Sequence, residues 1–132
     1  MAWVRVIIVN YNGGDLIGRT LSALAAQTMA DFEAVIVDNA STDGSADNLT
    51  LPDDRFRLIC AGANLGFAAG NNLGARGCTA PWIATLNPDA RPRPDWLDQL
   101  CRASERHAGV GVFGSTQLLG DDGRLIDGFG DV

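Results

Sequence analysis

Two apolar stretches of this sequence end at a carboxylate, and these acids are the first candidates for chemistry. Ala34–Val37 runs into Asp38, and Trp82–Leu86 runs into Asn87, Pro88 and Asp89. A carboxylate is not needed there, because Gly, Asn or Ser ends a strand equally well. In an open α/β sheet, ligands bind beyond the carboxyl ends of the strands. The two acids therefore predict one ligand site with two acidic contacts.

Four loops that follow predicted strands carry the other polar candidates. These loops contain Asn10, Tyr11 and Asn12; Asp38, Asn39 and Ser41; Asn64 and Gly66; and Asn87 and Asp89. A carboxylate such as Asp38 can accept N–H donors from a nucleobase edge or bond a ribose hydroxyl, and Tyr11 offers a flat face for a base. Gly66, at a predicted helix start, lets the backbone approach a ligand and points N–H groups outward.

The pair Asn87 and Asp89 is a candidate for a metal site. We expect these residues on an extended segment stiffened by Pro88, where a spacing of two places both oxygens on one side. A divalent cation bound with a nucleotide takes one or two carboxylates, and phosphate oxygens and water complete its shell. The spacing therefore fits a cation that is shared with a nucleotide.

Each candidate also has a simpler explanation. Asp38 can form an Asx-turn that caps a following helix, and Tyr11 can be a packed surface aromatic. Gly66 and Gly70 can reflect close helix–sheet packing, and Asp89 can be a solvated loop residue. These explanations weaken because all four loops are expected at one edge of the sheet.

Predicted strands and helices alternate along the chain with short polar connections. We expect strands at 4–9, 32–37, 55–61, 82–86 and 110–114, and helices at 15–27, 67–77 and 94–106. We also expect a short helix opening at 42–45 and a turn at 121–123 that leads into a hairpin. This order predicts a mainly parallel sheet with helices on both faces, in one domain over residues 1–132.

The composition is that of a soluble globular protein and argues against several classes. The net charge is −6 and there is no lysine, which disfavours nucleic acid as a partner and removes any Walker-type or Schiff-base lysine. The longest apolar stretch, Val6–Val9, is too short to span a membrane. Cys60, Cys78 and Cys101 lack zinc-ligand spacing, so we expect mostly buried, reduced thiols in the cytoplasm.

Four ordered motifs resemble glycosyltransferase family 2, in particular its bacterial rhamnosyltransferase-like branch. They are Val9–Asn12, Val37–Ser45, Asn64–Asn72 and Leu86–Ala90, and their spacing matches to about Gly114. The resemblance implies a GT-A fold, a Rossmann-like three-layer α/β sandwich with a mainly parallel sheet, incomplete at its C-terminus. It further implies an inverting glycosyltransferase of cell-surface polysaccharide biosynthesis. Such an enzyme moves a hexosyl or rhamnosyl group from a UDP-, dTDP- or GDP-sugar to a saccharide or lipid-linked acceptor.

Residue by residue, the resemblance also implies roles for the candidates. It implies nucleotide binding by Asn10, Tyr11, Asn12, Asp38, Asn39, Asn64, Gly66 and Asn71. Among these, Tyr11 and Asp38 would hold the nucleobase. Asp89 would close a DxD-type motif and, with Asn87, bind Mg²⁺ or Mn²⁺ as a Lewis acid on the leaving diphosphate. Because Asn87 stands where the motif has its first Asp, we expect weak metal binding without the donor.

The resemblance sets expectations for the whole protein as well. Family catalytic domains continue beyond this length, and their later segment supplies the acceptor site and an acidic general base. No catalytic residue is therefore assigned, and we expect this chain to bind the donor but to transfer sugar poorly alone. We expect a cytoplasmic protein. Peripheral association of the full-length protein with the inner face of the plasma membrane, and formation of a homo-oligomer, are both left open. The alternative function is a non-catalytic nucleotide-sugar-binding or assembly module, which would need a partner or a dimer.

Overall fold

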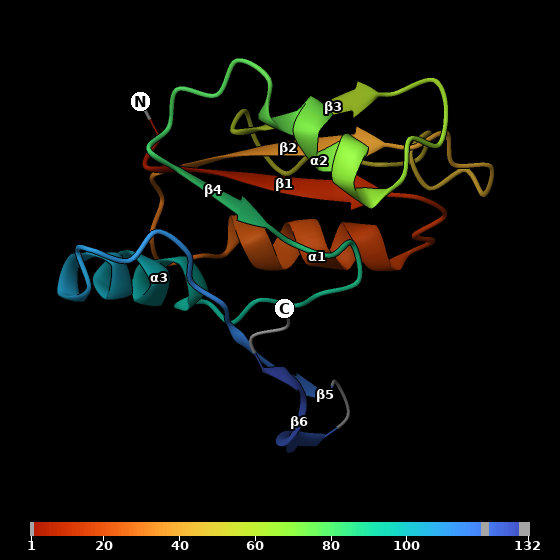
Figure 1. Ribbon diagram of the computed structural model, residues 1–132. Coiled ribbons are helices and arrows are strands. Elements are labelled where there is room, and N and C mark those ends of the chain that lie inside the picture. The colour runs from red at the N-terminus through yellow and green to blue at the C-terminus, as the bar shows by residue number, and fades with distance from the viewer. Residues whose placement is uncertain (1, 120–121, 130–132) are drawn as a thin grey trace. The chain divides into compact units, whose positions relative to one another are not determined.

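The computed structural model describes residues 2–119 and 122–129, which fall into two compact units. The first unit ends at Leu97 and the second begins at Asp98. The elements are β1 Val4–Asn10, α1 Leu16–Ala25, β2 Phe32–Asp38, β3 Phe56–Cys60, α2 Phe67–Ala75, β4 Trp82–Thr85, α3 Trp96–Arg106, β5 Thr116–Leu119 and β6 Asp122–Phe129 (Figure 1). The expectation of one domain over residues 1–132 stays a prediction.

The first unit is built on a four-stranded sheet in the order β3-β2-β1-β4. Every neighbouring pair in this sheet is parallel. β1 is buried along its whole length, which suits its nearly continuous apolar run, because a strand covered on both faces does not alternate with polar residues. Figure 1 shows α1 on one side of the sheet and α2 on the other. The predicted parallel α/β sandwich is confirmed.

Arg5 is the charged exception within β1, and it ties this strand to α2. Its guanidinium is 5% exposed and donates to the carbonyl oxygens of Gly74, at 3.0 Å, and of Arg76, at 2.8 Å. It also pairs with Glu33 across the β1–β2 ladder at 3.4 Å. The last carbonyls of a helix lack intrahelical donors and favour a nearby cation. Arg5 thus supplies both hydrogen bonds and positive charge to the end of α2.

Glycines on one face of α2 allow this helix to lie directly on the sheet. A Cβ added at Gly74 would lie 2.6 Å from Ile7 Cγ2, and one at Gly70 would lie 3.0 Å from Val9 Cγ1. The packing explanation is therefore confirmed for Gly70. Gly66 differs, because no atom lies within 4 Å of its added Cβ and its φ of +83° is the feature that favours glycine.

The short helix predicted to open at 42–45 is wrong. Residues 42–48 form bends and turns without a helix. Gly44 has a φ of +80° and Ala40 a φ of +60°, both incompatible with a right-handed helix. The carboxylate of Asp43 bonds the backbone N–H groups of Ser45 and Gly14, so this segment is organised by side chain–backbone bonds.

Three further expectations concern the strand at 110–114, the hairpin and the cysteines. The strand is wrong, because residues 110–115 are not in a strand, and Gly111 and Gly114 lower the strand propensity there. The hairpin is confirmed, because β5 pairs antiparallel with β6, but Asp122 and Gly123 of its predicted turn lie in β6, and Asp121 lies outside the described residues. The expectation of mostly buried thiols is wrong, since Cys60 is exposed and Cys78 and Cys101 are half-buried.

We expect Gly74→Ala to lower the free energy of unfolding by about 1–2 kcal/mol, because the added methyl group would overlap the side chain of Ile7 on β1 and one of the two must shift. Gly18→Ala is the matched control on α1, where an added Cβ meets nothing within 4 Å. This control should gain about 0.5–1 kcal/mol from helix propensity. Urea unfolding measures both variants, and equal effects at the two sites would contradict the close packing of α2.

Candidate functional site

A buried pair of side chains, Asn10 and Asp38, joins the carboxyl ends of β1 and β2. The two residues face each other in the parallel register and are 1% and 5% exposed. Asn10 Nδ2 donates to Asp38 Oδ1 at 3.1 Å. The same nitrogen lies 3.1 Å from Ser45 Oγ and 3.3 Å from Ser41 Oγ. One amide group therefore holds the strand ends and the loop after β2 together.

Asp38 forms the Asx-type turn that the simpler explanation predicts, although no helix follows it. Its Oδ2 accepts the N–H of Ser41 at 3.1 Å, and its Oδ1 accepts the Ser41 hydroxyl at 2.6 Å. A carboxylate offers about four acceptor positions, and these bonds with that from Asn10 use three of them. One position on Oδ2 remains for a further donor.

Asn12 fastens the loop after β1 to the loop after β2. Its Oδ1 accepts the N–H groups of Thr42, at 2.8 Å, and Asp43, at 3.3 Å, and its own N–H donates to Ser41 Oγ at 3.0 Å. The carbonyl oxygen of this predicted nucleotide contact is thus engaged within the chain. The neighbouring Tyr11 is 49% exposed, so its ring is accessible beside this network.

The loop after β3 is connected to the same edge through Asn39. This side chain is 2% exposed, and its Nδ2 donates to the carbonyl oxygen of Gly66 at 3.0 Å. Asn64 Oδ1 accepts the N–H of Gly66 at 3.0 Å, so both asparagines shape the loop that precedes α2. Asn71 lies within α2 and bonds the carbonyl oxygen of Phe67 on its own helix. The amide nitrogen of Asn71 is therefore engaged on its own helix.

Asn87 and Asp89 lie on a tight turn, so the expectation of an extended segment is wrong. The N–H of Leu86 donates to Ile7 O and extends the pairing of β4 with β1. The N–H of Ala90 then donates to Asn87 O at 3.1 Å, which closes a β-turn with Pro88 and Asp89 at its centre. Proline favours the second position of such turns because its φ is fixed near the required value.

The strand order brings the two acids of the sequence to one edge. β1 lies between β2 and β4, so Asp38 and the turn of Asp89 follow strands that are two spacings apart, roughly 10 Å. Asp38 is buried in its network, whereas Asn87 and Asp89 are both exposed. One end of the predicted site is thus organised by hydrogen bonds, and the other end presents accessible oxygens.

The donor set around Asp89 fits a shared cation better than a protein cage. Within residues 2–119 and 122–129, no group of three or more His, Cys, Asp or Glu side chains could hold a metal ion. One carboxylate and one amide oxygen on an exposed turn match the way Mg²⁺ binds with a nucleotide, where phosphate oxygens and water supply the other ligands.

Ser45 and Asp43 belong to this network, although neither is among the predicted site residues. Ser45 is 9% exposed and accepts the bond from Asn10, while Asp43 accepts the N–H of Gly14 at 3.0 Å and of Ser45 at 2.9 Å. Hydrogen bonds from the Ser45 side chain and N–H, with the N–H of Gly14, hold the pKa of Asp43 below its ordinary value. The Asp-Gly-Ser signal was present, but it indicates a turn here rather than a helix start.

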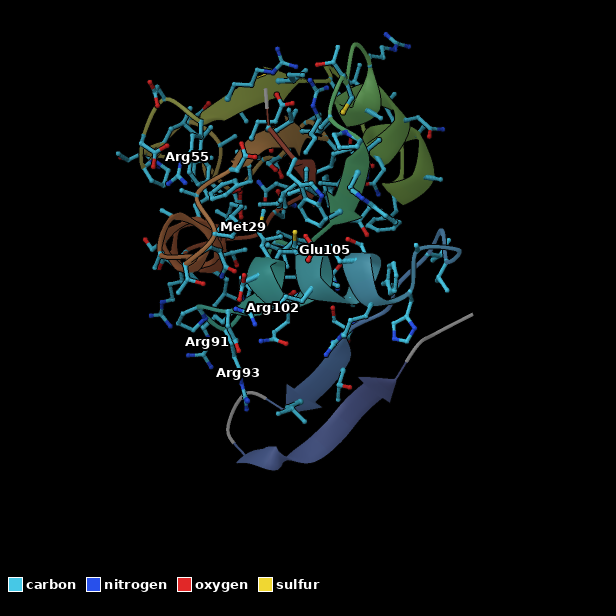
Figure 2. The ribbon with its side chains drawn as sticks, turned by 90° about the vertical axis from the view of Figure 1, so that its left-hand side faces the viewer. Met29, Arg55, Arg91, Arg93, Arg102 and Glu105 are labelled. Carbon is cyan, nitrogen blue, oxygen red and sulfur yellow. The ribbon has the colours of Figure 1, made fainter. Side chains whose placement is uncertain are left out.

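An open cavity of about 790 Å³ lies between the first turns of α1 and the loop that follows β2. None of the predicted nucleotide or metal residues lines it. Its charged lining consists of Arg19, Arg91, Asp15 and Asp43, whose formal charges cancel. Figure 2 shows Arg91 and Arg93 on one side of α1 and Arg55 on the other. The formal charges of its lining residues therefore give the cavity no net sign.

The sequence matches the family described as Glycosyl transferase family 2 over residues 5–127. The chain therefore belongs to this family. It is 30% identical over 130 residues to the succinoglycan biosynthesis protein ExoO of Rhizobium meliloti, covering 98% of the chain and 37% of that protein. It is 30% identical to the N-acetylglucosaminyl-diphospho-decaprenol L-rhamnosyltransferase of Mycobacterium tuberculosis, covering 83% of the chain and 39% of that enzyme.

Solved structures show the same fold. The Staphylococcus aureus protein TarS, residues 1–349 in complex with UDP-GlcNAc, superposes with a TM-score of 0.67 at 21% identity, covering 88% of the chain and 38% of that structure. The mannosyltransferase PcManGT of Pyrobaculum calidifontis, in complex with GDP-Man and Mn²⁺, superposes with a TM-score of 0.62 at 30% identity, covering 72% and 32%. The fold is thus that of GT-A glycosyltransferases. The chain spans less than half the length of each of these four proteins. In the described residues, no helix is long and apolar enough to cross a membrane.

We expect Ser45→Ala to raise the pKa of Asp43 toward its ordinary value, because it removes the hydroxyl that stabilises the carboxylate. A carboxylate with a lowered folded-state pKa adds stability above its unfolded pKa of about 3.9. That contribution disappears as the pH falls through the folded-state pKa. NMR titration of the Asp43 carboxyl carbon measures the change.

The control for this titration is Ser104→Ala, since the Ser104 hydroxyl donates to Cys101 O and not to Asp43. Asp43 should titrate in this variant as in the unchanged chain. An Asp43 pKa that stays the same in Ser45→Ala would show that the Ser45 hydroxyl does not hold the carboxylate.

Proposed function

We propose that this chain binds the nucleoside diphosphate of a nucleotide-diphospho-sugar at the carboxyl edge of its sheet, as the donor-binding part of an inverting family 2 glycosyltransferase. One observation carries the proposal. Asp38 and the turn of Asp89 follow the two strands that flank β1, so both acids lie at one edge. Nucleotide-sugar complexes of TarS and PcManGT, which share the fold, support the same ligand class.

The base is proposed to bind at the Asp38 end of the edge. Asp38 Oδ2 has an acceptor position left for an N–H of a base, and the exposed ring of Tyr11 offers a stacking face. The loop from Asn64 to Gly66 would lie beside the nucleotide, where the exposed start of α2 favours an anion. Asn10, Asn12 and Asn39 contribute by holding these loops in place.

The diphosphate is proposed to bind at the Asp89 end, with Mg²⁺ or Mn²⁺ held by Asp89 and Asn87. The cation would supply Lewis-acid stabilisation of the leaving diphosphate. In the full-length protein the sugar would pass to a saccharide or lipid-linked acceptor, in cell-surface polysaccharide biosynthesis at the inner face of the plasma membrane. The names of relatives such as the succinoglycan biosynthesis protein support this setting. No general base is proposed among the described residues.

Calorimetry with UDP, dTDP and GDP, each with and without Mn²⁺, tests donor binding by the chain. We expect at least one nucleotide to bind, and to bind more tightly when Mn²⁺ is present. Asp89→Asn should weaken binding in Mn²⁺ by about tenfold, or 1.4 kcal/mol, because it removes the one carboxylate of the turn. Without metal, this variant should bind at least as tightly as the unchanged chain, because it also removes a charge that repels the free diphosphate.

Asp38→Asn should weaken nucleotide binding about equally with and without Mn²⁺, because it acts at the base end. Asp54→Asn, which removes an exposed charge in the β2–β3 connection, is the control for net charge and should bind like the unchanged chain. Circular dichroism confirms that each variant is folded. If none of the three nucleotides binds the folded chain, the proposed function is wrong.

A further inference from the structure

Two polar side chains in this part of the chain are buried: Thr20 within α1, and Gln27 two residues after the helix ends at Ala25. Thr20 is 0% exposed and Gln27 is 7% exposed, although the other buried residues of α1 include the apolar Ile17, Leu21 and Leu24. The N–H of Gln27 donates to Leu24 O, so Gln27 follows directly on the last turn of α1. Buried polar groups are costly unless they are hydrogen-bonded, so their partners indicate what they do.

Both side chains bond the backbone of the segment that leaves β4. Gln27 Nε2 donates to Arg93 O at 2.7 Å, and Gln27 Oε1 accepts the N–H of Leu97 at 3.0 Å. Thr20 Oγ1 lies 2.8 Å from Pro88 O and 2.6 Å from Ala90 O. The connection after β4 therefore runs back along α1, as Figure 1 shows. It is bonded by Thr20 on the helix and by Gln27 just after the helix.

The Thr20 attachment lies directly on the turn of Asp89. The Thr20 hydroxyl also lies 3.2 Å from Leu16 O on its own helix, but its two shorter contacts are to the carbonyl oxygens of the residues on either side of Asp89. A hydroxyl has one proton, so these acceptors compete for it. The bond from Ala90 N to Asn87 O closes the same turn. The carbonyl oxygens of the residues before and after Asp89 thus both lie within hydrogen-bond distance of a hydroxyl on α1, while the Asp89 side chain remains exposed.

We propose that Thr20 is a positioning residue for the metal-binding turn, which it orients through the carbonyl oxygens of Pro88 and Ala90. The inference rests on the proposed function, in which Asp89 and Asn87 hold the cation. A cation with so few protein ligands depends on their being held in place before it binds, because ordering a loose turn costs affinity. Valine has nearly the shape of threonine but cannot donate, so Thr20→Val would leave both carbonyls facing a methyl group.

The test compares Thr20→Val with Thr20→Ser in the 132-residue chain. We expect Thr20→Val to lose about tenfold in UDP affinity measured with Mn²⁺ and to keep its affinity without metal. Thr20→Ser retains the donor and should stay within twofold of the unchanged chain in both conditions. Amide hydrogen exchange at Ala90 should become faster in Thr20→Val and not in Thr20→Ser, because the turn is loosened only when the donor is lost. If the calorimetry finds that dTDP or GDP binds and UDP does not, the nucleotide that binds replaces UDP in this test.

Gln27→Leu is the control for a purely structural effect of losing side-chain bonds to the connection after β4. It removes the bonds to Arg93 and Leu97, so it should destabilise the fold without changing the gain in UDP affinity from Mn²⁺.

If Thr20→Val loses affinity equally with and without Mn²⁺, or if Ala90 exchange is unchanged, Thr20 does not position the turn. If UDP binds the unchanged chain equally well with and without Mn²⁺, the metal assignment fails and this inference fails with it. If Mn²⁺ no longer raises UDP affinity in Asp89→Asn but still raises it fully in Thr20→Val, the role of Thr20 is wrong and the metal assignment stands.

Discussion

The hydrogen-bonding requirement of one buried amide, that of Asn10, determines how the candidate site is built. Asn10 ends the central strand and is 1% exposed, so its Nδ2 must find acceptors inside the protein. It finds them in Asp38, Ser41 and Ser45, all on β2 or the loop that follows it. The path of the loop after β2 is therefore fixed by a side chain of the neighbouring strand β1. The loop accepts a left-handed Ala40, at a φ of +60°, as part of that path.

The same network carries the neighbouring loops with it. Asn12 bonds the loop after β2, and Asn39, next to Asp38, bonds the carbonyl oxygen of Gly66 at the start of α2. On the sheet itself, Arg5 and the glycines of α2 hold that helix close to β1. Three loops of the edge are thus held by side-chain bonds from two strand ends, and a rigid sheet supports them. Loops held in this way can present a ligand site with little ordering cost when the ligand binds.

The sequence predicts the strands and their shared edge well, because β-branched runs and the β–α alternation are local signals. It fails where a distant contact decides. The segment 42–45 resembles a helix start, yet Asn12, about thirty residues earlier, takes its N–H groups and makes it a turn. Asn87 and Asp89 have the spacing of an extended segment, but they lie in a turn whose carbonyl oxygens, on either side of Asp89, are contacted by Thr20, about 70 residues earlier. Thr20 stands in an apolar stripe, and only its partners in the structure show its use.

The charge of this edge explains why a cation and a diphosphate would be expected to bind it together. Asp38 and Asp89 follow strands roughly 10 Å apart, in a chain whose net charge is −6. For scale, two like charges 10 Å apart repel by about 0.4 kcal/mol in water and about 1.7 kcal/mol at an effective dielectric constant of 20. A free diphosphate bound at this edge would be repelled by both acids. A diphosphate that carries a divalent cation would meet attraction instead, and the neutral Asn87 in place of a second acid lowers the repulsion while the cation is absent. Selectivity for the complex over the free anion then follows from the acids themselves, without a lysine or a protein metal cage.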